Sequence, residues 1–340
     1  MHSSGPRRPS FQYPAPMGSE LALMAARLTL TAAAEQAAGM PVEERRRRMF
    51  QALQSRDLDA VWALVLSHLV LYGRRGAQIS PGTIAQYRGA VTAFWTWAEP
   101  AGVTLTRPHA DVGRAYLRHL EGSGKRHSTV VWHLAAVKAL YEALRWCHVT
   151  EADPWRDVRP VADRVPRHLK GRLYSADQVD ALLAVANPEE AVAVLLGADC
   201  GLRAAEIMGL QRQQFRLNEE PPVVTVVGKG AKTREVGLSR RAEKAVHRWL
   251  EMTPRWGPAL FGATSTDWVQ DTLRRLCEAA GIEHTGRAVH GLRRTAGTRL
   301  YEETKDLLET RDFLGHRNAN TTEVYVAYAA QRKKPANRDW

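Results

Sequence analysis

Four short segments in the second half of the chain carry side chains that could do chemistry together. They read GLRAAE at 201–206, GKG at 228–230, HGLRR at 290–294 and LGH at 314–316, and Tyr325 follows nine residues after the last of them. Arginine and lysine bind anionic oxygens, histidine transfers protons near neutral pH, and a tyrosine hydroxyl can attack as a nucleophile. Each segment alone is weak evidence, because such an Arg–Glu spacing commonly makes a surface ion pair and a helix tyrosine commonly belongs to the core.

The order and spacing of the segments resemble the signature of the tyrosine recombinases, the phage-integrase and Xer-like family. The matching stretches read GLRAAEI, VGKGAKTREV, HGLRRTAGTRL and DLLETRDFLGHRNANTTEVY. The second domain matches closely and residues 60–160 match more loosely. The resemblance implies a site-specific DNA recombinase that cleaves and rejoins strands through a 3′-phosphotyrosyl intermediate. It implies no cofactor. ATP is not needed because the covalent link stores the energy of the broken bond, and a metal ion is not required because positive side chains around the phosphate can do its electrostatic work.

The resemblance also implies how positive groups would hold the scissile phosphate. Arg203 and Arg293 match the two arginines that bind it, and a guanidinium suits this role because it is always charged and offers paired donors to two oxygens. His316 matches the second histidine, which donates to a non-bridging oxygen. Lys229 matches the hairpin lysine that protonates the leaving 5′-oxygen, and the glycines beside it let the turn approach DNA closely. Together these donors would surround the negative charge of the transition state.

Tyr325 matches the nucleophile, which would form the covalent link to the 3′-phosphate. His290 matches the histidine that assists proton transfer at that nucleophile, and its three-residue offset from Arg293 places both on one helix face. Tyr328 competes with Tyr325 because it lies three residues later on the same face, but the spacing from His316 favours Tyr325.

Three further positions bear on this site. Glu206 matches the acidic position after the first arginine, where it would orient a basic side chain; a plain ion pair on a helix is the alternative. Many relatives have histidine where this chain has Arg294, which adds a charge near the site and removes no catalytic group. Cys200 stands where Thr or Ser is frequent, and we interpret it as a packing residue.

The composition independently favours a polyanionic partner. The 340 residues include 48 Lys and Arg against 36 Asp and Glu, for a net charge of +12 that is spread along the whole chain. The three cysteines lie far apart in the sequence, which excludes a disulfide framework and a zinc finger and fits a reducing compartment. Arg27 and Glu35 interrupt the longest apolar stretch, so we expect no membrane span and a cytoplasmic, nucleoid-associated protein.

The elements that must position the site are expected to be mainly helical. Apolar residues recur with helical spacing at 81–97, at 108–120 and after Ser128, and Ser80 with Pro81 is typical of a helix start. The first β signal is at 223–227, and a second short strand near 234–238 follows the GKG turn. The predicted fold class is therefore mainly α (α+β), with an N-terminal helical bundle and a C-terminal mixed domain that contains a small β-hairpin. With the resemblance, this becomes the tyrosine-recombinase fold.

We expect four regions along the chain: an N-terminal extension, partly disordered, at 1–45, a helical core-binding domain at 46–160, a basic linker at 161–174 and a catalytic domain at 175–340. The aromatic residues of the helical bundle are interpreted as core. Four successive arginines at 45–48 point in all directions from a helix, so a solvated helix end and a contact with DNA phosphates both remain open.

The expected partner is double-stranded DNA, bound by a homotetramer on two sites or by a heterotetramer with a paralogue. The alternatives are a type IB-like topoisomerase, which works as a monomer, and a non-catalytic DNA-binding protein of the same fold. Whether the short basic C-terminal tail exchanges between subunits is left open. The candidates for contacts with the DNA backbone are basic residues of the bundle, the linker, the hairpin and the HGLRR segment: Lys125, Arg126, Arg164, Arg167, Lys170, Arg172, Lys232, Arg234 and Arg294.

Overall fold

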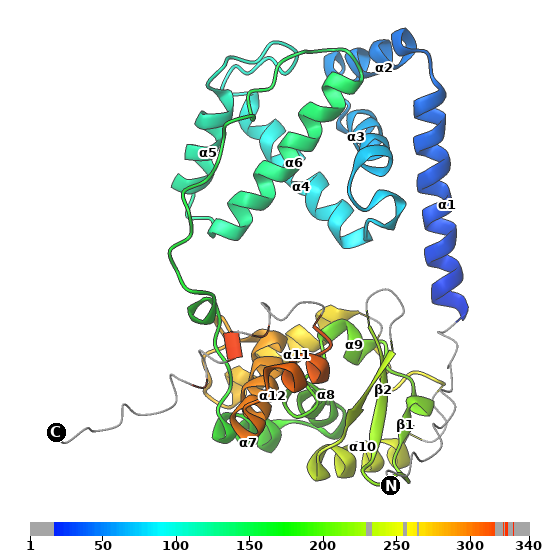
Figure 1. Ribbon diagram of the computed structural model, residues 1–340, viewed down its shortest axis with the longest axis vertical. Coiled ribbons are helices and arrows are strands. Elements are labelled where there is room, and N and C mark those ends of the chain that lie inside the picture. Colours follow the sequence, from blue (N-terminus) through cyan, green and yellow to red (C-terminus); the bar gives the residue numbers. More distant parts are fainter. Residues whose placement is uncertain are drawn as a thin grey trace, which may run out of the picture. The chain divides into compact units, whose positions relative to one another are not determined.

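Two separate units make up the chain, Met1–Asp163 and Arg164–Trp340, and each has its own hydrophobic core (Figure 1). The computed structural model describes residues 17–228, 233–253, 257–263, 265–316, 322, 324, 325 and 329, with the backbone alone at 17–23, 167 and 168. Lys229, Lys232 and Tyr328 lie outside the described residues. The linker expected at 161–174 spans the boundary between the two units.

In the part that the structure describes, the first unit consists of helices joined by loops and contains no strand. Ser80 accepts a hydrogen bond from the Thr83 N–H at 3.2 Å and Pro81 is the first helical residue, so the predicted helix start is confirmed. The helix expected at 108–120 begins later, at Val112, because the residues before it form turns. The helices are α1 (Met17–Gly39), α2 (Val42–Gln54), α3 (Leu58–Tyr72), α4 (Pro81–Ala98), α5 (Val112–Gly122) and α6 (His127–Trp146), with a 3₁₀ turn at Gly76–Gln78.

Aromatic side chains form the centre of this unit. Phe94 of α4 is fully buried and meets Tyr116 and Trp155 edge-on, with ring centroids 4.9 and 5.4 Å apart. Arg45 is also buried, with its guanidinium 4.2 Å from the ring centroid of Trp146 and hydrogen-bonded to the Trp146 carbonyl at 3.3 Å. Of the four successive arginines, Arg45 therefore belongs to the core, which neither of the two open interpretations anticipated.

The second unit is built around α8 (Pro188–Ala198), whose last seven residues are all buried. It contacts α7, α9, α10, α11 and α12, so the helix that begins at Arg203 and the helix that carries Arg293 both pack against one central helix (Figure 1). Its helices are α7 (Ala176–Val185), α8, α9 (Ala204–Met208), α10 (Arg240–Met252), α11 (Thr266–Ala279), α12 (Ala288–Thr304) and α13 (Leu307–Leu314), with 3₁₀ turns at Arg167–Lys170 and Arg212–Gln214.

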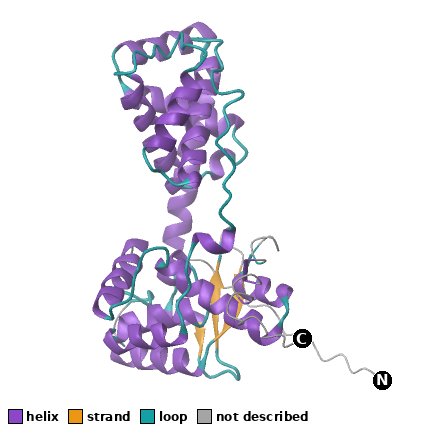
Figure 2. Ribbon diagram, turned by 90° about the vertical axis from the view of Figure 1, so that its left-hand side faces the viewer, coloured by secondary structure: helices purple, strands orange, loops and turns teal. Residues whose placement is uncertain are grey.

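A small antiparallel sheet lies beside these helices (Figure 2). The predicted hairpin is confirmed as β2 (Val223–Val227) and β3 (Thr233–Gly237), paired so that Val226 faces Arg234. A third strand, β1 (Phe215–Arg216), pairs with β2, and the sequence did not predict it because two residues are too few to show alternation. The predicted mainly α (α+β) class is confirmed.

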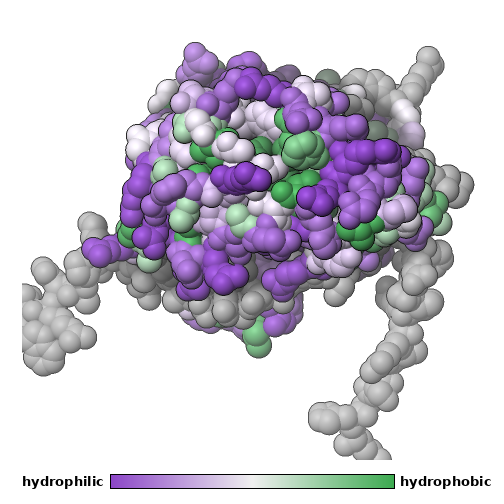
Figure 3. All heavy atoms as spheres, turned by 90° about the horizontal axis from the view of Figure 1, so that it is seen from above, coloured by the Kyte–Doolittle hydropathy of each residue, from purple (hydrophilic) through white to green (hydrophobic). Residues whose placement is uncertain are grey.

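The face drawn in Figure 3 is mostly hydrophilic, and its apolar side chains gather in small patches between the polar ones. Among the described residues, the helices are all too short or too polar to cross a membrane.

Candidate active site

Arg203 stands at the first turn of α9, immediately after a sharp bend in the chain. Gly201 makes this bend with a φ of +65°, which favours glycine because other residues rarely adopt it. The Arg203 N–H donates to Glu206 Oε2 at 2.9 Å, and its guanidinium donates to Glu206 Oε1 at 2.6 Å. Both ends of Arg203 are therefore tied to one carboxylate, while its side chain stays partly exposed.

Arg293 is the most deeply buried charge of the site, at 3% exposed. It lies on α12, and its guanidinium donates to the carbonyls of Gly201 and Leu314. Burial, followed by repulsion from Arg203, lowers the pKa of Arg293 to about 10, so it stays charged at neutral pH. Arg293 thus links the bend before α9 to the end of α13.

Glu206 is a buried carboxylate that joins the arginines of the site. Besides Arg203, it accepts two parallel hydrogen bonds from Arg234 of β3, at 3.1 and 3.0 Å, and Arg293 lies 3.9 Å away. Burial opposes its ionisation, but the hydrogen bonds from Arg234 and the Arg203 N–H, together with their charges, hold the pKa of Glu206 at about 2. These contacts favour the orienting role over a plain ion pair at the helix surface.

Backbone carbonyls at the C-terminal end of α13 accept hydrogen bonds from all three arginines. The Phe313 carbonyl accepts from Arg234 at 3.2 Å, the Leu314 carbonyl from Arg293, and the Gly315 carbonyl from Arg203 at 3.5 Å. These carbonyls carry the partial negative charge of a helix C-terminus, which stabilises nearby cations. Gly315 ends the helix with a φ of +62°, and His316 follows directly.

His316 lies against both the arginines and Tyr325. Its Nδ1 is 3.0 Å from Thr322 Oγ1, and its ring stacks on that of Tyr325 with centroids 6.1 Å apart and an 18° angle between the planes. Burial lowers the pKa of His316 to about 4, aided by the charges of Arg293 and then Arg203. The imidazole is therefore neutral at pH 7 and keeps one N–H to donate.

Tyr325 is buried beside α12, at 4% exposed. Its N–H donates to the Thr322 carbonyl at 2.9 Å, and Leu314 packs against it. The ring lies so close to Gly297 that a Cβ there would be 2.8 Å from Tyr325 Cε1. A glycine on α12 is therefore what lets this tyrosine approach the helix.

His290 lies one turn before Arg293 on the same helix, and part of the residue is exposed to solvent while the rest is shielded by the chain. Desolvation by the surrounding chain lowers the pKa of His290, and the charges of Arg294, Arg293 and Arg203 lower it further. A neutral His290 is able to accept a proton. Lys229, expected at the tip of the hairpin, lies outside the described residues.

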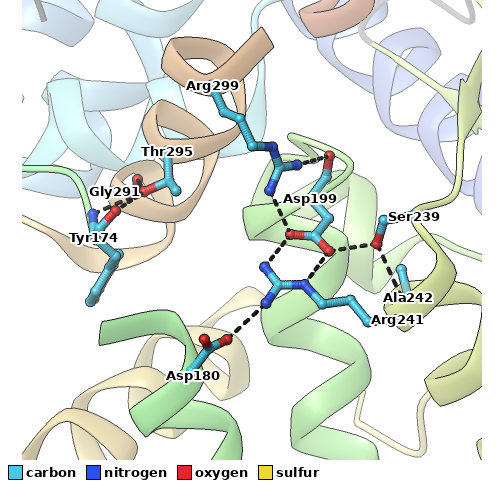
Figure 4. Close-up of polar contacts among 9 residues, drawn as sticks. All are labelled: Tyr174, Asp180, Asp199, Ser239, Arg241, Ala242, Gly291, Thr295 and Arg299. Carbon is cyan, nitrogen blue, oxygen red and sulfur yellow. Dashed lines mark hydrogen bonds and ion pairs between the residues drawn. The ribbon is translucent and has the colours of Figure 1, made fainter. Parts of the chain in front are cut away.

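Two polar clusters fix α12, which carries His290 and Arg293 (Figure 4). Thr295 Oγ1 accepts from the Tyr174 N–H at 2.9 Å and lies 2.8 Å from the Tyr174 carbonyl, so the end of the linker is tied to α12. Further along the helix, Arg299 donates to the carboxylate of Asp199 at 3.1 Å.

Asp199 ends α8 just before the Gly201 bend, and its side chain is fully buried. It also accepts from Arg241 at 2.6 and 2.7 Å and from Ser239 at 2.5 Å, at the start of α10 (Figure 4). Burial opposes ionisation of Asp199, but the hydrogen bonds from Arg241 and Ser239 outweigh it and lower the pKa. Sequence reasoning missed this residue, because its partners are 40 to 100 positions away and no motif marks them.

The residues predicted to contact DNA lie in different surroundings. Arg234 is turned inward, with a side chain 15% exposed that bonds to Glu206 and Phe313, so its contacts argue against the predicted role. Arg294 lies over Gly171, where a Cβ would be 1.9 Å from its Nη1, and Arg172 pairs with Glu283. The side chains exposed to solvent are Lys125, Arg126, Arg164, Lys170 and Arg172, while Lys232 and the side chain of Arg167 lie outside the described residues.

Comparisons with known proteins agree across both units. The model of the phage integrase family matches residues 172–332, and that of the phage integrase N-terminal SAM-like domain matches residues 72–148. The tyrosine recombinase XerD of Vibrio vulnificus (strain YJ016) is 28% identical over 299 residues, which cover 82% of this chain and 91% of that protein. The tyrosine recombinase XerC of Pseudomonas fluorescens is 27% identical over 270 residues, 74% of this chain and 87% of that one.

Solved structures share the fold at lower identity. The XerH site-specific recombinase bound to palindromic difH substrate has a TM-score of 0.61 at 16% identity, covering 86% of this chain and 93% of that one. A lambda integrase dimer bound to a COC′ core site has a TM-score of 0.62 at 16% identity, covering 82% and 79%. With both family models matched in order and the fold shared, the chain belongs to the phage integrase family and is a site-specific tyrosine recombinase that acts on DNA.

Proposed function

We propose that this recombinase cleaves DNA by attack of Tyr325 on a phosphodiester held by Arg203, Arg293 and His316. One observation carries the proposal: the end of α13 accepts hydrogen bonds from both arginines and leads directly into His316, which stacks on Tyr325. Residues more than a hundred positions apart thereby surround one small volume, with the types of side chain that phosphoryl transfer needs.

The arrangement suits the charge that develops during the reaction. A phosphodiester is an anion that repels an incoming oxygen nucleophile, and the transition state gathers negative charge on its equatorial oxygens. Arg203 and Arg293 are already held in place by Glu206 and by backbone carbonyls, so little reorganisation is needed when the phosphate arrives. The neutral His316 donates its N–H to a non-bridging oxygen.

The atoms and protons balance without a further reactant. The Tyr325 oxygen forms a bond to phosphorus, the bond from phosphorus to the 5′-oxygen breaks, and the tyrosine proton passes to His290. Lys229 gives a proton to the leaving 5′-oxygen, as the resemblance implies. Rejoining reverses these steps when a 5′-hydroxyl attacks the phosphotyrosyl link, so the bond energy is kept and neither ATP nor a metal ion is consumed.

Tyr325 has to become accessible to the scissile phosphate. The residue is 4% exposed and its ring lies against Gly297, so we propose that the segment carrying Tyr325 shifts when DNA binds. We further propose that the two units grip duplex DNA together and that a tetramer, of this chain alone or with a paralogue, pairs two sites for strand exchange in the cytoplasm.

The test is a Tyr325→Phe variant on nicked suicide duplexes, in which a cleaved strand cannot be rejoined. We expect wild-type protein to accumulate a covalent protein–DNA adduct and the variant to bind the same DNA with wild-type affinity but form no adduct, because only the hydroxyl is removed. The measurement is denaturing electrophoresis for the adduct together with fluorescence anisotropy for binding. An undiminished adduct in the variant overturns the assignment of Tyr325.

A further inference from the structure

Three arginines lie around Glu206: Arg203, Arg234 and Arg293. The proposed reaction gives a role to Arg203 and Arg293 but none to Arg234. It lies on β3, and its guanidinium makes three hydrogen bonds inside the protein: two to Glu206 and one, from Nε, to the Phe313 carbonyl at 3.2 Å. With a side chain 15% exposed, it is less accessible than Arg203, whose side chain is 36% exposed. Its geometry is that of a bridge between two segments of the protein.

One end of the bridge is the carboxylate that holds Arg203. The two parallel bonds from Arg234 use one side of Glu206 and leave its remaining lone pairs for the Arg203 N–H and guanidinium. A planar guanidinium can make this paired contact, whereas a lysine ammonium offers a single point of charge. Arg234 therefore fixes the direction in which Glu206 presents its oxygens to Arg203.

The other end of the bridge is the turn that carries His316. Phe313, Leu314 and Gly315 present consecutive carbonyls to Arg234, Arg293 and Arg203. Arg234 also packs against Gly315, where a Cβ would be 3.1 Å from its Cδ and Nη1. The turn is thus held from the side of β3 as well as from α9 and α12.

Electrostatics explains why a third arginine is tolerated here. Three guanidinium groups face one carboxylate, so repulsion alone would drive them apart. Glu206 and the carbonyls at the end of α13 offset part of that charge and leave an excess of positive charge for a phosphate. Arg234 donates its hydrogen bonds to these neutralising groups, whereas the side chain of Arg203 stays more exposed to solvent.

From these contacts we propose that Arg234 is a positioning residue for DNA cleavage: it holds Glu206, and through it Arg203, in register with the turn that carries His316. This deepens the proposed function and rests on it. The same contact places β3 at a fixed offset from the two arginines. The competing role is the one that sequence suggests, a direct contact with the DNA backbone.

The test compares Arg234→Lys and Arg234→Ala with wild type on suicide duplexes whose nick lies at an attachment site mapped beforehand. Single-turnover cleavage, DNA affinity and its salt dependence are measured for each. Arg216→Lys is the matched control, because Arg216 lies in the same sheet and its ion pairs run to Glu219 and Glu235. Thermal unfolding reports whether each variant is folded.

A positioning role predicts that cleavage slows by about tenfold in Arg234→Lys and by about a hundredfold in Arg234→Ala, as expected for small misplacements of catalytic groups. DNA affinity and its salt dependence should match wild type in both, and Arg216→Lys should cleave normally. Arg234→Lys keeps a positive charge against Glu206, so it carries the test where the alanine variant does not fold. Combining Arg234→Lys with Glu206→Gln should cost no more than the slower single variant, because both act through one contact.

A phosphate contact predicts the opposite pattern. Lysine would then replace arginine with little effect on cleavage, and Arg234→Ala would reduce the slope of log affinity against log salt by about 0.9. Either result, or additive effects of the Arg234 and Glu206 changes, overturns the inference. The proposed function is judged separately by the wild-type adduct: if wild type cleaves and Arg234→Lys cleaves equally well, only the inference about Arg234 fails.

Discussion

At the scale of single residues, His316 holds an unusual electrostatic position. It is surrounded by Arg293, Arg203 and Arg234, and burial together with these charges lowers its pKa to about 4. A phosphate that enters the site brings negative charge to the same place, which raises the pKa of the imidazole again and strengthens its hydrogen bond. Burial and the surrounding positive charge thus keep His316 neutral, and its N–H is the group that we propose donates to the phosphate.

This predicts a pH dependence of stability with a definite sign. The pKa of His316 is about 4 in the folded chain and near 6.5 in the unfolded chain, so between these values the unfolded state binds more protons. The free energy of unfolding of the second unit should therefore fall as pH falls from about 6.5 towards about 4, and less steeply in a His316→Asn variant. NMR titration of the imidazole of His316 checks the cause directly. A titration midpoint at or above 6.5 in the DNA-free protein would contradict this description of the site.

At the scale of elements, the approach of Tyr325 to α12 depends on a missing side chain. Gly297 is buried, and a Cβ there would be 2.8 Å from both Leu314 Cδ1 and Tyr325 Cε1. The ring of a buried tyrosine cannot give way without moving the segment that carries it, because interiors are close-packed. The position of Tyr325 therefore depends on a glycine in α12, 28 residues earlier in the chain.

We expect Gly297→Ala to displace this segment, lower the free energy of unfolding by about 1–3 kcal/mol through overpacking and slow cleavage. Gly89→Ala in α4 is the matched control, since nothing lies within 4 Å of a Cβ at Gly89 and alanine favours a helix over glycine by about 1 kcal/mol. Chemical denaturation and the suicide-substrate assay measure the two effects. Equal stability changes in the two variants would show that Gly297 is not constrained by its contacts.

The sequence predicted the elements better than it predicted their contacts. Helix starts such as Ser80–Pro81 and the hairpin around the GKG turn are local patterns, and the structure confirms both elements. Asp199 and the inward turn of Arg234 depend on partners far away along the chain, which no local pattern records. The roles of the catalytic residues came from the resemblance, because single Arg, His or Tyr residues are chemically ambiguous until their neighbours are known.

At the scale of the whole molecule, the charge of +12 divides into two kinds. Arg203 and Arg293 are held by hydrogen bonds at one site, whereas Lys125 and Arg126 are exposed on the helical unit. Exposed cations that bind phosphates release counterions from DNA, so their contribution falls with added salt. Substitution of the exposed cations should therefore change the salt dependence of DNA affinity without changing cleavage.

We expect DNA affinity to fall steeply with salt and each of Lys125→Ala and Arg126→Ala to reduce the slope of log affinity against log salt by about 0.9. Cleavage at saturating protein should be unchanged in both variants, because neither residue belongs to the site. Arg118→Ala is a matched control, since this exposed arginine of α5 is ion-paired with Glu121. Slopes equal to wild type would remove Lys125 and Arg126 from the DNA interface.

The proposed reaction links Tyr325 to a 3′-phosphate. The most direct measurement is to trap the covalent adduct of the wild-type protein on a suicide duplex, digest it and identify the modified peptide and the DNA ends by mass spectrometry. We predict a single phosphotyrosyl peptide with the link at Tyr325, attached to the 3′ end of the cleaved strand, and a free 5′-hydroxyl on the other fragment. A link at Tyr328, or an adduct at a 5′-phosphate, would contradict the proposed attack of Tyr325.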